Sequence, residues 1–445
     1  MNTFSRLMLP VCLGAAFLLA LLITGCPVSS SLNVANGTNP TRSQRWLPED
    51  KIYDPTIHTP QLYRPPYQAS YPVLFKGAVE PLVLEFDQWL PEDKPFDDYY
   101  VDIVNCDRFW RPTTLLPIEF YDGFTQVRIE NYERSRFTKV PYMHYVHAFP
   151  RENEGFKMSG NYILKVYRNA NPSDVVLTRR FIVVEREATI ETKYELSSRL
   201  VREKMADLAF EVVVPGVQVF NPAQDLTVKV MQNFRWDSEV VMGAPRFYTP
   251  PRFEYYIDFM DAFQGGNEFR YHANASTQLL FESVEDIEDR QDAWHFFLFK
   301  DDPLTRNVFR SYGDRNGTFS VQVEEWDDPR VQADYVLNQF RVRSNAPVDG
   351  NVYVFGKFSD WQMLPQYQLE WNEALGVYER DIWLKQGIYD YEYVVKRSGD
   401  PLPDEATFQG RHEFSENFYT VLVYHRRPTD RTDRLIGYQP FNYQD

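Results

Sequence analysis

The stretch YILKVY, residues 162–167, is followed by RRFIVV, residues 179–184, and a polar turn cluster at 169–174 separates them. Both stretches are rich in β-branched and aromatic residues and have the length of a strand. Two such runs joined by a short polar loop predict a β-hairpin, which we interpret as the closing pair of a β-sandwich. Because Lys165 shares a face with Ile163, we expect that face to meet solvent.

Similar runs continue along the chain, separated by turns that contain Gly, Pro, Asn or Asp. The remaining strand-like runs lie at 210–214, 226–230, 294–299, 339–343, 351–355, 377–384, 389–395 and 418–424. An aromatic content of 16% and 30 prolines favour short strands over long helices. The one helix that the pattern indicates is short, at 196–208, and we expect an acidic loop or a short polar turn at 284–292.

The sequence therefore predicts an all-β protein with three consecutive β-sandwich, Ig-like domains. We place an N-terminal sandwich at 56–186, a middle β domain at 187–333 and a C-terminal, early-set Ig-like sandwich at 334–445. The stretch 26–55 has little apolar periodicity and is interpreted as a tether.

The N-terminal segment has Arg6 in a basic region, an apolar run at 11–22, and then Ile23-Thr24-Gly25-Cys26. This layout is typical of a secretory signal peptide and is too short for a spanning helix. The four residues resemble a bacterial lipobox, which implies cleavage after residue 25 and lipidation of Cys26. No acidic run follows Cys26, which favours a body that faces the periplasm and is anchored to the outer membrane.

No common catalytic signature is present, neither a nucleophile elbow nor a zinc-binding His-Glu-x-x-His nor a phosphate-binding loop. We interpret His144 and His147 as ordinary side chains, since three residues apart on a strand they lie on opposite faces. Cys106 has no adjacent base and is expected to be a small buried side chain. We predict no catalytic residues, no metal ligands and no cofactor; a hydrolase with a site between domains remains a third hypothesis. The net charge of −16 argues against nucleic-acid binding.

One element of the C-terminal domain suggests a sugar-binding function. VYVFGKFSDW, residues 352–361, and LKQGIYDYEYVV, residues 384–395, resemble the glycogen- and starch-binding β-sandwich modules. In those modules exposed aromatic rings stack on sugars, so the resemblance makes Trp361 a candidate, with Trp371 or Trp383 contributing. A glycan-binding lipoprotein is therefore the alternative function.

A wider set of blocks, in a fixed order, resembles the plug protein family of the type IX secretion system of Bacteroidota. The blocks are FYDGF at 120–124, VPY at 140–142, MSGNY at 158–162, LTRRF at 177–181, NP at 221–222, QNFRWD at 232–237, GGNEFRY at 265–271, the stretch 351–361 and DRLIG at 433–437. Together they span about 56 to 440 of the chain.

This resemblance implies a non-enzymatic protein that closes the periplasmic opening of a large outer-membrane β-barrel translocon when the barrel carries no cargo. Aromatic and arginine side chains are enriched at the centres of protein interfaces. The block at 232–237 makes Arg235 and Trp236 candidate partner-binding residues, with Trp361 as a third, although a role in ordering loops is the alternative for them.

Overall fold

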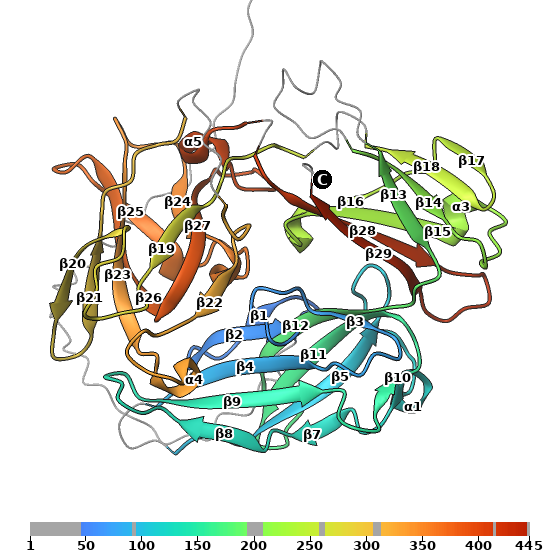
Figure 1. Cartoon of the computed structure of the whole chain (residues 1–445), viewed down its shortest axis with the longest axis horizontal. Coiled ribbons are helices and arrows are strands. Elements are labelled where there is room, and N and C mark those ends of the chain that lie inside the picture. The colour runs from blue at the N-terminus through green and yellow to red at the C-terminus, as the bar shows by residue number, and fades with distance from the viewer. Residues whose placement is uncertain are drawn as a thin grey trace, which may run out of the picture. The chain divides into compact units, whose positions relative to one another are not determined.

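The computed structural model describes residues 46–90, 95–193, 208–257, 263–305, 313–412 and 415–442 (Figure 1). The predicted signal peptide, Cys26 and all but the last residue of the helix expected at 196–208 lie outside these ranges. The described residues form strands joined by loops and single-turn helices, each α-helix having four residues. The predicted all-β class is confirmed.

The first module, which we call the first sandwich, consists of two main sheets. One sheet has the order β1-β12-β11-β5-β7, with β3 beside β12, and the other has the order β2-β4-β9-β8. Their bounds are β1 Lys51–Ile52, β2 Ile57–Tyr63, β3 Val73–Phe75, β4 Leu82–Trp89, β5 Tyr99–Cys106, β7 Gln126–Arg128, β8 Asn131–Arg134, β9 Tyr142–Phe149, β11 Gly160–Arg168 and β12 Val175–Val184. A small pair, β6 Tyr121–Asp122 and β10 Gly155–Phe156, and helix α1 Pro117–Phe120 close one end.

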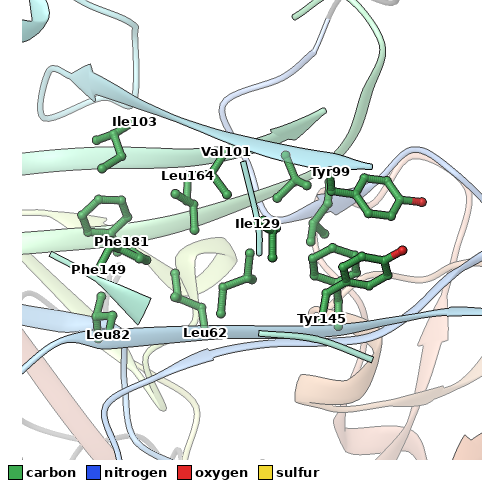
Figure 2. Close-up of a cluster of buried hydrophobic side chains, with 14 of the residues drawn as sticks. Leu62, Leu82, Tyr99, Val101, Ile103, Ile129, Tyr145, Phe149, Leu164 and Phe181 are labelled. Carbon is green, nitrogen blue, oxygen red and sulfur yellow. The ribbon is translucent and has the colours of Figure 1, made fainter. Parts of the chain in front are cut away.

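The predicted hairpin is confirmed, because β11 and β12 pair antiparallel from Gly160 opposite Val183 onward. Both strands are longer than their apolar runs. Between the two sheets lies an apolar core in which Leu164 and Phe181 of the hairpin meet Leu82 and Phe149 of the other sheet (Figure 2). Burial of these side chains supplies the main stabilisation of the sandwich.

The expectation that Lys165 meets solvent was wrong. Its side chain is 8% exposed, and its Nζ lies 2.8 Å from Asp102 Oδ2 on the neighbouring strand β5. The ring of Trp46 covers the ammonium at 5.7 Å. On the same face Ile163 is fully buried. A lysine within a strand is therefore no sign of a solvated face where an adjacent strand supplies a carboxylate.

The second module combines segments from two distant parts of the chain, and we call it the split sandwich. One sheet has the order β13-β14-β18-β17 and the other has the order β16-β15-β28-β29. Their bounds are β13 Thr189–Lys193, β14 Ala209–Val213, β15 Leu226–Gln232, β16 Val240–Val241, β17 Phe247–Thr249, β18 Arg252–Tyr256, β28 Phe418–His425 and β29 Arg434–Asn442. Helix α3 Pro222–Asp225 and the 3-10 turn η1 Trp236–Ser238 flank β15.

The third module is a nine-stranded sheet whose order is β19-β27-β24-β25-β26-β23-β21-β20, with β22 beside β27. Its bounds are β19 Arg270–Ala273, β20 Val284–Asp289, β21 Trp294–Leu298, β22 Phe319–Val321, β23 Tyr335–Arg343, β24 Asn351–Phe355, β25 Gln368–Asn372, β26 Val377–Lys385 and β27 Gly387–Lys396. The short turns are α4 Pro329–Gln332, η2 Lys357–Ser359, η3 Pro365–Tyr367 and α5 Ala406–Gln409. The acidic loop expected at 284–292 is instead mostly strand β20, which pairs with β21.

Strand pairing differs from the predicted boundaries on the C-terminal side of the first sandwich. The range 187–333 contributes β13 to β18 to the split sandwich but β19 to β22 to the third module, and the range 334–445 is divided in the same way. The predicted run at 418–424 is strand β28, but it pairs with β15 (Figure 1). The C-terminal strands β28 and β29 therefore complete the split sandwich, although they are far from β15 in the sequence.

The two faces of β28 explain this placement. Val421 and Val423 point into the core of the split sandwich, whereas Leu422 and Tyr424 point into a separate apolar layer. That layer also contains Ile163 of the first sandwich. A strand that is apolar on both faces is stable only with packing on both sides, which a central position between two modules provides.

Cys106 is fully buried in the same apolar layer, as expected, and is the free cysteine of the described residues. Burial raises the pKa of its thiol to about 12, so the side chain behaves as a small apolar group at neutral pH. Across the described ranges, no helix has the length and apolarity to cross a membrane. The same ranges contain no group of His, Cys, Asp or Glu side chains suited to a metal ion.

Candidate functional site

The three candidate residues predicted for partner binding lie together where the modules meet. We call this region the joint and define it as Trp110, Arg180, Phe234, Arg235, Trp236, Asp360 and Trp361. It contains a loop from each module: the loop after β5 in the first sandwich, the loop after β15 in the split sandwich, and the turn after β24 in the third module. The side chains of the three candidates contact other parts of the chain, and partner binding by them stays a prediction.

Arg235 is buried and bridges the split sandwich and the third module. Its guanidinium lies 2.8 Å from Asp237 and 2.7 Å from Glu405. The guanidinium also lies over the ring of Trp361, 4.7 Å from the ring centroid. Burial alone would lower the pKa of Arg235, but Glu405 and Asp237 raise it. Arg235 is therefore a buried structural cation with its charge satisfied within the chain.

Trp361 is only 8% exposed and is packed between two rings, Phe355 at 5.4 Å and Phe269 at 5.9 Å. A sugar ring needs an exposed aromatic face, so this side chain does not form the platform that the glycan-binding alternative requires. The other two tryptophans of that alternative also pack internally. Trp371 contacts Tyr378 at 5.1 Å, and Trp383 contacts Trp89 of the first sandwich at 5.4 Å.

Trp236 is half-buried and contributes to the contact between the first and the split sandwich. Its ring lies edge-on to Trp110 at 4.7 Å and to Phe234 at 5.2 Å. The guanidinium of Arg180 lies over Trp110 at 4.7 Å, and burial lowers the pKa of this arginine. Arg180 thus contacts rings from two modules, in a geometry that favours cation–π attraction.

The adjacent Arg179 extends the joint to the third module. Its Nη2 lies 3.0 Å from Asp360 Oδ2, and both side chains are nearly buried. Burial raises the pKa of the Asp360 carboxyl, whereas Arg179 and Lys357 oppose this shift. The two consecutive arginines of β12 therefore contact different modules, a role that the sequence pattern of a hairpin does not indicate.

Several bulky residues of the joint adopt left-handed backbone conformations. Trp110, Phe234 and Trp361 have φ values of 63°, 54° and 56°. Such values are unfavourable for large side chains and cost about 1 kcal/mol or more each. Trp110 and Phe234 are nearly buried in the apolar layer between modules, and Trp361 is nearly buried within the third module. Tertiary packing therefore holds the backbone in these conformations.

A second buried contact joins the first sandwich to the third module. Asp87 of β4 accepts hydrogen bonds from Lys385 Nζ at 2.6 Å and from the hydroxyl of Tyr335 at 2.7 Å. Nδ1 of His144 lies 2.6 Å from the other carboxylate oxygen. Burial alone would raise the pKa of Asp87, but Lys385 and His144 lower it, whereas burial lowers the pKa of Lys385.

The sequence analysis missed this second contact. His144 was interpreted as a histidine without an acidic partner, and Asp87 is 57 residues away in the chain. His147 is on the opposite face and stacks on Phe149 at 5.9 Å. The available signal was Lys385, a lysine that directly follows the apolar run 382–384 at the end of β26.

The packing of Trp361 yields a testable prediction. Gly317 has a φ of +75°, and a Cβ at this position would overlap Trp361 Cη2 and lie 2.8 Å from Phe269. We expect Gly317→Ala to reduce the free energy of unfolding by about 3 kcal/mol through overpacking and backbone strain. Gly77→Ala is the control, because Gly77 has a φ of +82° but open space around it. Equal losses for the two variants in urea unfolding would contradict the tight packing of Trp361.

The second contact yields another prediction. Lys385→Met leaves the Asp87 carboxylate buried without its cation, so we expect a loss of about 3 kcal/mol in the free energy of unfolding. Adding Asp87→Asn should restore more than half of that loss, because the unpaired charge is then removed. Since the pKa of Asp87 lies below 3.8, its contribution in the unmodified protein is present above about pH 4 and lost as the pH falls. A double variant as unstable as Lys385→Met would show that charge pairing is not the cause.

Comparison with known proteins gives a family match for part of the chain and similar solved structures, one of which spans most of the chain. Residues 57–185 match the family model described as the first domain of type 9 secretion system plug proteins. A crystal structure of a hypothetical protein from Parabacteroides merdae is 25% identical, covers 88% of this chain and 99% of its own, and superposes with a TM-score of 0.82. No curated protein matches the sequence. Residues 57–185, which form most of the first sandwich, are therefore similar to the first domain of type 9 secretion system plug proteins.

Proposed function

We propose that this chain is a non-enzymatic plug subunit of the type IX secretion system, which closes the periplasmic opening of the outer-membrane translocon in its cargo-free state. The observation that carries the proposal is the match of residues 57–185 to the plug family model. The match begins and ends one residue inside the first-sandwich boundaries expected from the sequence, 56 and 186. The partner in this proposal is the large β-barrel of the translocon.

The contacts between the modules support this role. A protein that closes a wide pore must keep its shape against thermal motion, and a rigid body loses little conformational entropy on docking. The joint and the Asp87–Lys385 contact tie the three modules together through buried charges and rings. Separating the modules would expose the rings of Trp110, Trp236 and Trp361 to water, which is unfavourable.

The proposed location is the periplasm, with a lipid anchor on Cys26 that holds the body beside the outer membrane. The residues before 46 that would form the anchor and tether lie outside the described structure, so the proposal rests on the lipobox-like sequence at 23–26. A tether of about 30 residues raises the effective concentration of the body at a pore in the same membrane. Glycan binding through Trp361 is not proposed, since that side chain is buried.

A pull-down from native membranes tests the partner. We expect a C-terminally tagged protein, extracted in mild detergent, to recover one very large outer-membrane barrel in near-equal amount, as identified by mass spectrometry. A strain that lacks the gene should be more permeable than the parent strain to a large antibiotic that the outer membrane normally keeps out of the periplasm. Recovery of no barrel, together with unchanged permeability, would refute the plug role.

The anchor has a separate test. Cys26→Ala removes the thiol that the lipid attachment and the cleavage after it need, so we expect the protein to leave the outer-membrane fraction. Fractionation and immunoblotting measure this shift, with Cys106→Ala as the matched control that leaves the anchor unchanged. Outer-membrane association of the Cys26→Ala variant equal to that of the parent protein would contradict lipid anchoring.

A further inference from the structure

A large cleft lies where the first sandwich, the split sandwich and the third module adjoin. Its volume is about 900 Å³, and it does not include any residue of the joint defined above. Its apolar lining includes Phe75, Ile190 and Tyr438. Single ions need far less space, so the cleft has the size for a ligand of several residues.

Three arginines and three carboxylates line this cleft. Arg64, Arg186 and Arg315 line it, one from each of three separate segments, and all three are exposed. Elsewhere the excess of carboxylates pairs with most arginines. Within the described ranges, none of the three has a carboxylate oxygen at ion-pair distance, and Arg186 lies over the ring of Phe75 at 4.0 Å.

The carboxylates of the same cleft are already bound within the chain. Glu185 is 2.6 Å from Lys76 and is also paired with Arg434. Asp314 accepts hydrogen bonds from the backbone N–H groups of Phe269 and Asn316. Glu416 accepts one from the Asn442 amide at 2.8 Å. The cleft therefore has guanidinium groups without ion-pair partners, whereas each of its carboxylates accepts at least one hydrogen bond within the chain.

The backbone of the cleft favours an extended polypeptide as the ligand. Strand β29 pairs with β28 on one side, and on its other side it bonds to the 185–188 segment through Leu435 and Ile436. From Gly437 to Pro440 this second edge has no backbone partner among the described residues, and it borders the cleft. Pro440 has no backbone N–H group to donate to a partner strand. Only a short segment can therefore pair along this edge.

We propose that this cleft binds an extended, acidic peptide segment of a partner protein. The carboxylates of the segment pair with Arg64, Arg186 and Arg315, its apolar side chains contact Phe75 and Tyr438, and its backbone lies along the free edge of β29. Arginine favours this chemistry because its planar fork matches a carboxylate. The same fork also matches phosphate, but the apolar lining and the free edge of β29 favour a peptide over a free phosphate ion.

The test uses two fluorescein-labelled decapeptides, one alternating glutamate with valine and the other alternating lysine with valine. Fluorescence anisotropy with the purified mature protein should show saturable binding of the glutamate peptide, weakened by added salt, and none of the lysine peptide. We expect the triple variant Arg64→Gln, Arg186→Gln, Arg315→Gln to weaken binding by about tenfold or more, because charge-assisted hydrogen bonds are lost.

The matched control is Arg134→Gln, which removes an exposed arginine on the edge strand β8, outside the cleft. This variant should change the affinity for the glutamate peptide by less than about twofold. That change corresponds to less free energy than one hydrogen bond contributes. Thermal unfolding checks that the triple variant is folded, as expected for exposed residues without ion-pair partners. No binding by the parent protein, equal binding of the lysine peptide, or displacement by inorganic phosphate at the peptide's own concentration would overturn the proposal. These measurements need no translocon, so their failure leaves the plug role untouched.

Discussion

The apolar layer between the first and the split sandwich is the constraint on which the arrangement of this protein depends. Ile163 and Ile182 cover one side of this layer, and Met231 and Leu422 cover the other. Each sandwich already has a complete core of its own, yet each presents a second apolar face. Two such faces are stable only against each other, because exposing either would leave a large apolar surface in water.

Charged side chains surround this layer and determine which faces can meet. Arg179 pairs with Asp360, Arg235 with Glu405, and Lys385 with Asp87, each between segments far apart in the chain. Buried ion pairs add little net stability compared with apolar packing, but a displaced partner leaves a charge buried alone. These pairs therefore penalise arrangements of the modules that bury one partner without the other.

The strands were largely predictable, whereas the environment of single residues was not. Alternation and composition locate β11, β12, β24 and β28 because these patterns follow from local backbone geometry. The same reasoning placed Lys165 in solvent and the 284–292 range in a loop. Both errors have one cause, which is a neighbouring strand. Strand β5 supplies Asp102, which pairs with Lys165, and strand β21 pairs with the 284–289 segment as β20. Such partners are distant in sequence and leave no local signal.

The sequence by itself determined the all-β class, the hairpin at 160–184 and the family resemblance of the first sandwich, because each depends on short runs of residue type and order. Only the tertiary structure decided that β28 and β29 complete a sandwich begun at β13, and that Trp361 is buried under Arg235. The physical reason is that burial and pairing are properties of contacts between segments. A strand that is apolar on both faces requires two neighbours, but it does not specify which segments of the chain they are.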